Sequence, residues 1–141
     1  MRAVVQRALG ASVTVLGSQV GGFEGPGLVV LLGVTHGDAG PQAQTMARKI
    51  AELRIMRGEE SAVTLMAPVL VISQFTLYGS TKKGRRPTWV AAAPGPVAEP
   101  LVERVAQLLA ERGLPVSRGV FGADMQISFT NDGPVTLLLD T

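Results

Sequence analysis

Residues 28 to 34, Leu-Val-Val-Leu-Leu-Gly-Val, form a continuous apolar run of the length of one β-strand. A strand without alternating polar residues has both faces buried, so this run predicts a strand in the middle of a layered structure. No apolar run in the sequence is long enough to span a membrane. Hydrophobic residues make up 46% of the chain and charged residues 17%, which indicates a packed globular protein.

The residues before this run also indicate strands. Residues 2–9 and 11–17 are rich in valine and alternate in character, and Gly10 separates them. A third short strand is predicted at residues 18–23. We therefore expect an antiparallel β-meander that leads into the strand at residues 28–34.

Two later segments have helical spacing of apolar residues. The first spans residues 41–53, where Asp38 or Pro41 supplies a start, and the second spans residues 101–112, where Gly113 supplies an end. Further strands are predicted at residues 54–56, 69–77, 115–120, 125–129 and 135–139, with residues 130–134 connecting the last two.

This order of elements predicts an α+β fold in one domain over residues 1–141. We expect β-rich, barrel-like sheets packed on each other with two main helices on one side, which makes three α/β/β layers. The charged N-terminal residues do not match the apolar core of a secretory signal, so a cytoplasmic location is expected.

The counts of cysteine and histidine limit which metal sites and catalytic mechanisms are possible. The sequence contains no cysteine and one histidine, which leaves no disulfide, no iron–sulfur cluster and few possible zinc sites. His36 lies in Thr-His-Gly-Asp-Ala-Gly-Pro, which is typical of a solvated surface loop before a helix. We therefore expect an activity without metal or cofactor, in which His36 has no catalytic role.

Positive charge is concentrated in one loop. Four of the 13 Lys and Arg residues lie in Lys82-Lys83-Gly84-Arg85-Arg86, and without them the acidic residues outnumber the basic ones. Such a loop suits a phosphate-rich partner. A solvated loop that keeps the protein soluble explains the composition equally well.

Three segments place polar or glycine residues at the ends of apolar strands, where functional sites are usually built. They are Ser73-Gln74-Phe75-Thr76-Leu77, Phe121-Gly122-Ala123-Asp124-Met125 and Asn131-Asp132-Gly133-Pro134-Val135-Thr136. In the first, Ser73 and Thr76 offer hydroxyl groups, but no His or Lys lies close in sequence to act as a base. In the third, local chemistry favours an ordinary turn between strands, since only about 5–6% of X–Pro bonds are cis.

Together the three segments resemble the bacterial D-aminoacyl-tRNA deacylase family in motif, order and spacing. That family carries a Ser-Gln-Phe-Thr motif in mid-chain and a Gly-cisPro motif near its C-terminus. The opening MRAVVQRALGASVTV, the LLGV at residues 31–34 and the FGADM segment extend the resemblance over nearly the whole chain. Residues 57–62 depart from it, because they lack the expected Asp, Gly-Lys and Asn.

The resemblance implies a hydrolase that cleaves the ester between a D-amino acid and the terminal ribose of tRNA. Backbone amides and the tRNA's own 2′-hydroxyl would carry the chemistry. The backbone around Phe75 and Thr76 would hold the ester and ribose, with Ser73 and Gln74 positioning them. Thr76 would position the substrate and not act as the nucleophile, because no general base is evident.

The resemblance also implies a homodimer with active sites at the subunit interface. Gly133 and Pro134, joined by a cis bond, would enter the partner's site and exclude L side chains with their carbonyl oxygens. Glycine would pass this filter, so glycyl-tRNA is an expected second substrate. Arg7 would hold the motif through hydrogen bonds to backbone carbonyls, and Phe121, Gly122, Ala123 and Met125 would support the site.

Two other functions fit parts of the sequence. A non-catalytic RNA-binding domain would use the basic loop and Trp89, but one Trp and one Tyr make no stacking platform. Trp89 is better explained as a half-buried anchor. A structural homodimer could use the last two strands as its interface. In the enzyme interpretation, Lys82, Lys83, Arg85 and Arg86 bind tRNA.

Overall fold

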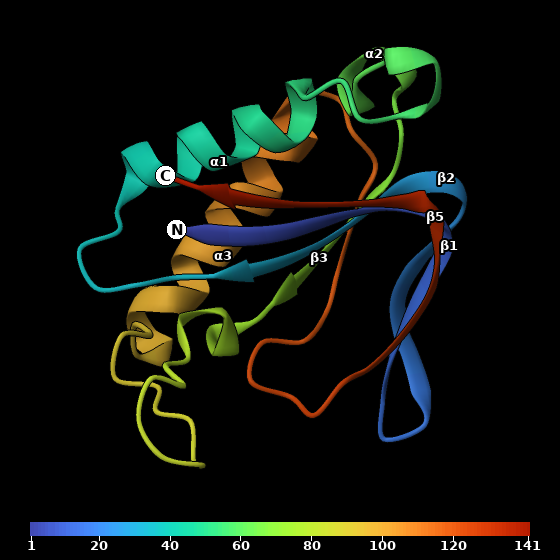
Figure 1. Cartoon of the computed structure of the whole chain (residues 1–141). Helices are drawn as coiled ribbons and strands as arrows, with labels where there is room; N and C mark the ends of the chain where they lie inside the picture. Colours follow the sequence, from blue (N-terminus) through green and yellow to red (C-terminus); the bar gives the residue numbers. More distant parts are fainter.

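The computed structural model describes residues 1–141 and contains one mixed five-stranded sheet (Figure 1). The strand order is β4-β3-β2-β1-β5. The first strand pairs antiparallel with the second and the fifth, whereas the second, third and fourth run parallel. The strands are β1 (Arg2–Val15), β2 (Ser18–Gly33), β3 (Val69–Ser73), β4 (Val116–Arg118) and β5 (Gln126–Asp140), the helices are α1 (Gly40–Glu52), α2 (Ala62–Leu65) and α3 (Gly95–Glu111), and two 3₁₀ turns are η1 (Arg57–Glu59) and η2 (Phe75–Tyr78). The predicted α+β class is confirmed.

The apolar run at residues 28–34 forms the second half of β2, between β1 and β3. Leu28, Val30 and Leu32 belong to the core beneath the helices. Val29 belongs to a separate buried cluster on the opposite face. The prediction that this strand is buried on both faces is therefore confirmed.

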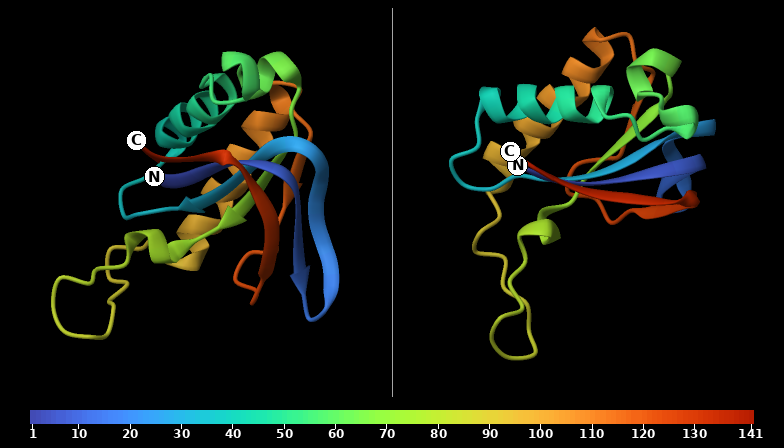
Figure 2. Two further views of the ribbon diagram at one scale, coloured as in Figure 1. Left: turned by 45° about the vertical axis from the view of Figure 1, so that its right-hand side comes forward. Right: turned by 45° about the horizontal axis from the view of Figure 1, so that its top comes forward.

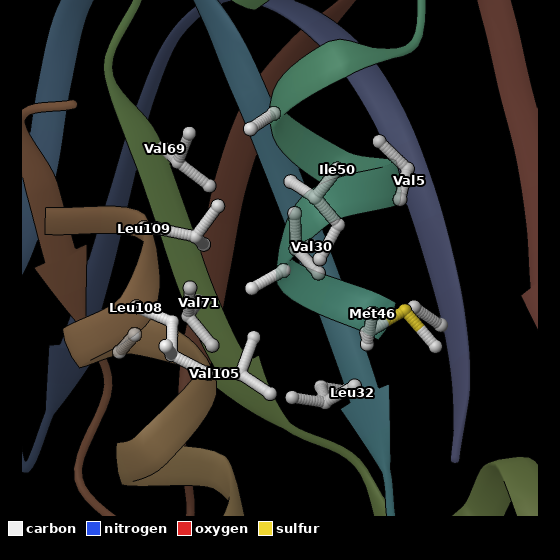
Figure 3. Packing of buried hydrophobic residues seen from close by; sticks show 14 of the residues in the cluster. Val5, Val30, Leu32, Met46, Ile50, Val69, Val71, Val105, Leu108 and Leu109 are labelled. Carbon is white, nitrogen blue, oxygen red and sulfur yellow. The ribbon is translucent and has the colours of Figure 1, made fainter. Parts of the chain in front are cut away.

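Helices α1 and α3 cover one face of the sheet (Figure 1). Figure 3 shows Ile50 of α1 and Leu109 of α3 facing the strand residues Val30 and Val69. The two main helices were predicted, but α3 begins at Gly95, six residues before its predicted start. Pro96 is compatible with this start because the first N–H groups of a helix have no acceptor inside it. No helix is both long and apolar enough to span a lipid bilayer.

The opposite face is covered by the sheet itself. The long strands β1, β2 and β5 bend, so that their far ends pass beneath the part that carries the helices (Figures 1 and 2). Ala11 and Val13 from the far end of β1 are buried with Leu70 and Ile72 of β3. The expectation of separate packed sheets is corrected: one bent sheet supplies both β layers.

Two predicted strand boundaries are wrong for a common reason. Gly10 does not end a strand, and residues 130–134 do not connect two strands, because β1 and β5 continue through both places as bulges. A glycine in the left-handed region, φ +73° at Gly10, lets pairing resume after the irregularity. Residues 54–56 form no strand, and β3 ends at Ser73, where η2 follows.

Gly27 of β2 packs closely against the backbone that leads into β3 and against the ring of Phe23. A Cβ atom at this position would lie 2.6 Å from the carbonyl oxygen of Pro68 and 2.5 Å from the Phe23 ring. We expect Gly27→Ala to lower the free energy of unfolding by about 1–3 kcal/mol, the usual cost of overpacking. Urea unfolding measures this change.

Gly40, the first residue of α1, is the matched control, because an added Cβ there meets no atom within 4 Å. Gly40→Ala should leave stability unchanged or raise it by about 0.4–1 kcal/mol. Equal stability of the two variants would contradict the close approach at Gly27.

Candidate functional site

A cavity of about 570 Å³ opens where the parallel strands β2 and β3 end. Its walls are mostly apolar and come from five parts of the chain: the end of β2, residues 72–75, residues 89–93, the start of α3, and residues 121–125 with Ile127. The carboxyl ends of parallel strands are a common place for binding sites, because the chain leaves the sheet there. Two of the three segments singled out in the sequence therefore meet at one cavity.

The Ser73–Leu77 segment turns sharply out of the sheet. The backbone N–H of Gln74 donates to the carbonyl oxygen of Leu32 at 2.8 Å, which extends the pairing of β3 with β2 by one bond before η2 begins. Gly33 permits this path, since a Cβ atom there would lie 2.9 Å from the Gln74 carbonyl oxygen. The Gln74 side chain donates to Thr76 Oγ1 at 2.5 Å. Ser73, Gln74 and Phe75 line the cavity, whereas Thr76 lies beside it and is exposed.

Two aromatic rings stand at one side of the cavity. Phe75 and Trp89 meet edge to face, with ring centroids 5.4 Å apart. Trp89 also covers Gly79, where a Cβ atom would lie 2.5 Å from the indole ring. Trp89 is 42% exposed, more than expected for a half-buried anchor, although its ring packs on Phe75 and Gly79.

The Phe121–Met125 segment forms the opposite wall. Met125 packs over Gly119 and Ile72, as the atoms nearest to a Cβ at Gly119 show. Phe121, Gly122, Ala123 and Asp124 complete this wall in an irregular loop between β4 and β5. The contact of this loop with β3 joins positions about 50 residues apart in the sequence.

Gly133 and Pro134 do not line the cavity of their own chain. They lie in a bulge of β5, because the register passes from Thr136 opposite Gln6 directly to Asn131 opposite Ala8. The Asn131 side chain closes the bulge by donating to the carbonyl oxygens of Arg7 at 3.0 Å and Val135 at 3.1 Å.

The backbone contains no cis peptide bond, so the predicted cis bond between Gly133 and Pro134 is wrong and the bond is trans. The bulge supplies the physical reason. Gly133 adopts φ +98°, a conformation that favours glycine, and this turns the chain into a trans proline without breaking the strand. Both residues are exposed.

Arg7 contacts this bulge as the sequence suggested. Its Nε donates to the carbonyl oxygen of Asp132 at 3.1 Å, and its Nη1 donates to the carbonyl oxygen of Ile55 at 3.0 Å. A Cβ atom at Gly133 would lie within 2.3 Å of Arg7 Nη2. Any larger residue would have to displace the Arg7 guanidinium and adopt the same positive φ, so the position favours glycine.

Asp132 and Arg57 were not predicted from the sequence. Arg57 Nε and Nη2 donate to the two carboxylate oxygens of Asp132 at 3.0 and 2.6 Å, and Arg7 lies 3.2 Å from one of them. The hydrogen bond from Arg57 is the largest cause that lowers the pKa of the Asp132 carboxyl, and the charges of Arg57 and Arg7 add to it against desolvation. The only sequence signal for Arg57 was its place in residues 57–62, which depart from the family pattern.

The basic loop lies apart from these contacts. Lys82, Lys83, Arg85 and Arg86 are all exposed in a loop that is closed at its base by pairing of Ser80 with Thr88. Figure 2 shows the loop extending from the body of the protein, on the side of η2. Trp89 follows the loop in the sequence and lines the cavity.

His36 is exposed, as expected for a surface loop, and its ring contacts the carbonyl oxygen of Val90 at 3.0 Å. It does not line the cavity. No group of three or more His, Asp or Glu side chains is arranged to hold a metal ion.

Solved structures share this fold over the full chain. One described as c-Myc DNA Unwinding Element Binding Protein matches with a TM-score of 0.91 and 37% identity, covering 100% of this chain and 99% of the other. A probable eukaryotic D-amino acid tRNA deacylase matches with a TM-score of 0.84 over 99% of this chain and 98% of the other. At 17% identity, the second likeness concerns the fold alone.

Sequence relatives are much closer. D-aminoacyl-tRNA deacylase of Kineococcus radiotolerans is 62% identical over 99% of both chains, and that of Acidothermus cellulolyticus is 60% identical over the same shares. The family model described as D-Tyr-tRNA(Tyr) deacylase matches residues 4–140. The resemblance seen in the three sequence segments is thus confirmed along the whole chain, and the protein belongs to the D-Tyr-tRNA(Tyr) deacylase family.

Proposed function

We propose that this protein hydrolyses the ester bond of D-aminoacyl-tRNA and releases free tRNA and the D-amino acid. The observation that carries the proposal is the cavity at the end of β3, where Ser73–Phe75 and Phe121–Met125 meet. Its full-length relatives at 62% and 60% identity are called D-aminoacyl-tRNA deacylases. The cavity has apolar walls for a nucleoside and backbone amides at its edge for an ester.

Hydrolysis of this ester requires stabilisation of the negative charge that develops on the carbonyl oxygen. Phe75 and Thr76 begin η2, and the first N–H groups of a helical turn have no acceptor inside it. These amides are therefore the donors that we assign to the developing oxyanion. The neighbouring 2′-hydroxyl of the tRNA ribose assists the attack, and Ser73 and Gln74 position the ester.

Thr76 positions the substrate in this mechanism. Its hydroxyl is held by the side chain of Gln74, and no basic side chain contacts it. A threonine hydroxyl needs a nearby base to become a nucleophile. The backbone of Thr76, and not its side chain, therefore carries its main role.

Selection for D-amino acids is assigned to Gly133 and Pro134 of a partner subunit. Both residues are exposed on β5, an edge strand of the sheet, and they do not line the cavity of their own chain. Their carbonyl oxygens would exclude an L side chain by steric contact. Hydrogen bonds from Arg7 and Asn131 to the bulge, and not a cis bond, hold Gly133 and Pro134 in a fixed position. Glycyl-tRNA, which has no side chain to exclude, is a second substrate.

The basic loop is assigned to tRNA binding. Its four exposed cations lie next to Trp89, which borders the cavity, so they suit the phosphates that lead to the aminoacylated end. In the proposed function, the enzyme is a homodimer that acts on tRNA in the cytoplasm without a cofactor.

The direct test compares deacylation of D-tyrosyl-, L-tyrosyl- and glycyl-tRNA by the purified protein. We expect hydrolysis of the D-substrate at least 100-fold faster than of the L-substrate, on the order that steric exclusion at a rigid site supplies. Glycyl-tRNA should be hydrolysed as well. Sedimentation of the same preparation should show two chains. RNA binding without deacylation would favour a non-catalytic RNA-binding domain.

The second experiment replaces Lys82, Lys83, Arg85 and Arg86 with alanine. Binding of tRNA should weaken by about tenfold or more, and the slope of log affinity against log salt should become shallower, because fewer counterions are released. Arg48→Ala combined with Arg104→Ala removes exposed charges from α1 and α3 and serves as the control. Unchanged affinity and slope in the loop variant would assign tRNA binding elsewhere.

The third experiment separates a hydroxyl nucleophile from RNA-assisted hydrolysis. Thr76→Ala should retain kcat/KM within about tenfold of wild type, whereas a substrate ending in 2′-deoxyadenosine should lose about 100-fold or more. Each rate is divided by the spontaneous hydrolysis rate of the same substrate, since the 2′-hydroxyl affects that rate too. An inactive Thr76→Ala together with an active Thr76→Ser would show that the Thr76 hydroxyl takes part in the reaction.

A further inference from the structure

Arg57 is an exposed arginine with an unusually well-defined contact. Its side chain is 71% exposed, yet two of its nitrogens are held by the carboxylate of Asp132, whose side chain is only 6% exposed. A paired, two-point contact fixes the direction of the guanidinium as well as its distance. Ion pairs in which both side chains are exposed have one contact each, as between Arg48 and Glu52 at 3.8 Å.

The turn that carries Arg57 is itself fixed. Gly58 and Glu59 have φ values of +75° and +56°, which bend the chain tightly after Arg57. The Met56 amide donates to the carbonyl oxygen of Glu60 at 2.9 Å and closes the turn. The Arg54 side chain adds a hydrogen bond to the carbonyl oxygen of Glu59.

The turn is joined to the β5 bulge at two places. Arg7 is the first link, because its Nη1 and Nε donate to the carbonyl oxygens of Ile55 and Asp132 respectively. Arg57 links them at the surface through the Asp132 carboxylate. Asp132 directly precedes Gly133, and Arg57 Nη2 lies 3.9 Å from the position that a Gly133 Cβ would occupy. Arg7 thus binds the peptide carbonyl before Gly133, and Arg57 binds the side chain of the same residue, Asp132.

We propose that Arg57 is a positioning residue that sets where Gly133 and Pro134 reach, and so sets the strictness of D-over-L selection. This inference rests on the proposed function. Steric exclusion depends steeply on the place of the excluding atoms, and a displacement of 1 Å can change a rate by about 100-fold. Without Arg57, Asp132 keeps Arg7 but loses the contact that fixes its second oxygen.

A purely structural ion pair would have another signature. The Asp132 carboxylate is buried, so a purely structural role of Arg57 predicts that its removal lowers stability and leaves the D/L ratio unchanged. A positioning role instead predicts a lower D/L ratio in a protein that is still folded. Because Arg57 does not line the cavity, the KM for the D-substrate should stay unchanged.

The experiment measures kcat and KM for D-tyrosyl- and L-tyrosyl-tRNA with wild type, Arg57→Ala, Arg57→Lys and the control Arg48→Ala. We expect Arg57→Ala to lower the D/L ratio of kcat/KM by tenfold or more. Arg57→Lys, which keeps the charge but not the two-point contact, should fall between it and wild type. Arg48→Ala should match wild type, and thermal unfolding checks that all variants are folded.

A double-substitution cycle locates the effect. If Arg57 acts through Asp132, then Asp132→Asn combined with Arg57→Ala should lower the D/L ratio no further than Asp132→Asn alone. A wild-type protein without preference for the D-substrate would overturn the proposed function itself. A wild-type D-preference that Arg57→Ala leaves intact, in a folded protein, would overturn this inference alone. Equal losses in Arg57→Ala and Arg48→Ala would also overturn it.

Discussion

Burial of the parallel strands β2 and β3 between two apolar layers fixes the position of the other elements. Alternate residues of each strand enter different clusters: Val30 and Val71 face the helices, whereas Val29 and Leu70 face the bent ends of the long strands. Removing both faces from water is the main source of stability for such a pair. The helices on one side and the bend on the other both follow from this requirement.

The same pair of strands creates the cavity. β2 and β3 end at the same edge of the sheet, so the segments that follow them leave the sheet there. Gly33 lets these two segments lie in contact. Ser73–Phe75 turn away here into η2 and leave amide groups at the rim. The bent strand β5 brings the preceding loop, Phe121–Met125, to the opposite wall. Packing in the core therefore determines the shape of the candidate site.

A cluster of charged side chains stabilises a second part of the structure, the bulge of β5. A carboxylate as poorly exposed as that of Asp132 must be paired, and Arg7 and Arg57 supply the partners. The pairing joins the strand to the turn at Arg57–Glu59, so the exposed Gly133 and Pro134 are supported from two elements. Under the proposed function, the core forms the pocket and this ion cluster positions the selective residues, in different parts of the same chain.

The sequence by itself determined the buried strand at residues 28–34, the two main helices and the family, because periodic patterns and motifs are carried by neighbouring residues. It also indicated Ser73–Thr76, Phe121–Met125, Gly133 and Pro134 as site residues, but not which of them meet. Only the tertiary structure decided the bend of the sheet, the trans bond at Pro134 and the pairing of Arg57 with Asp132. These features depend on strand register and on a contact across 75 positions, and local patterns do not encode either.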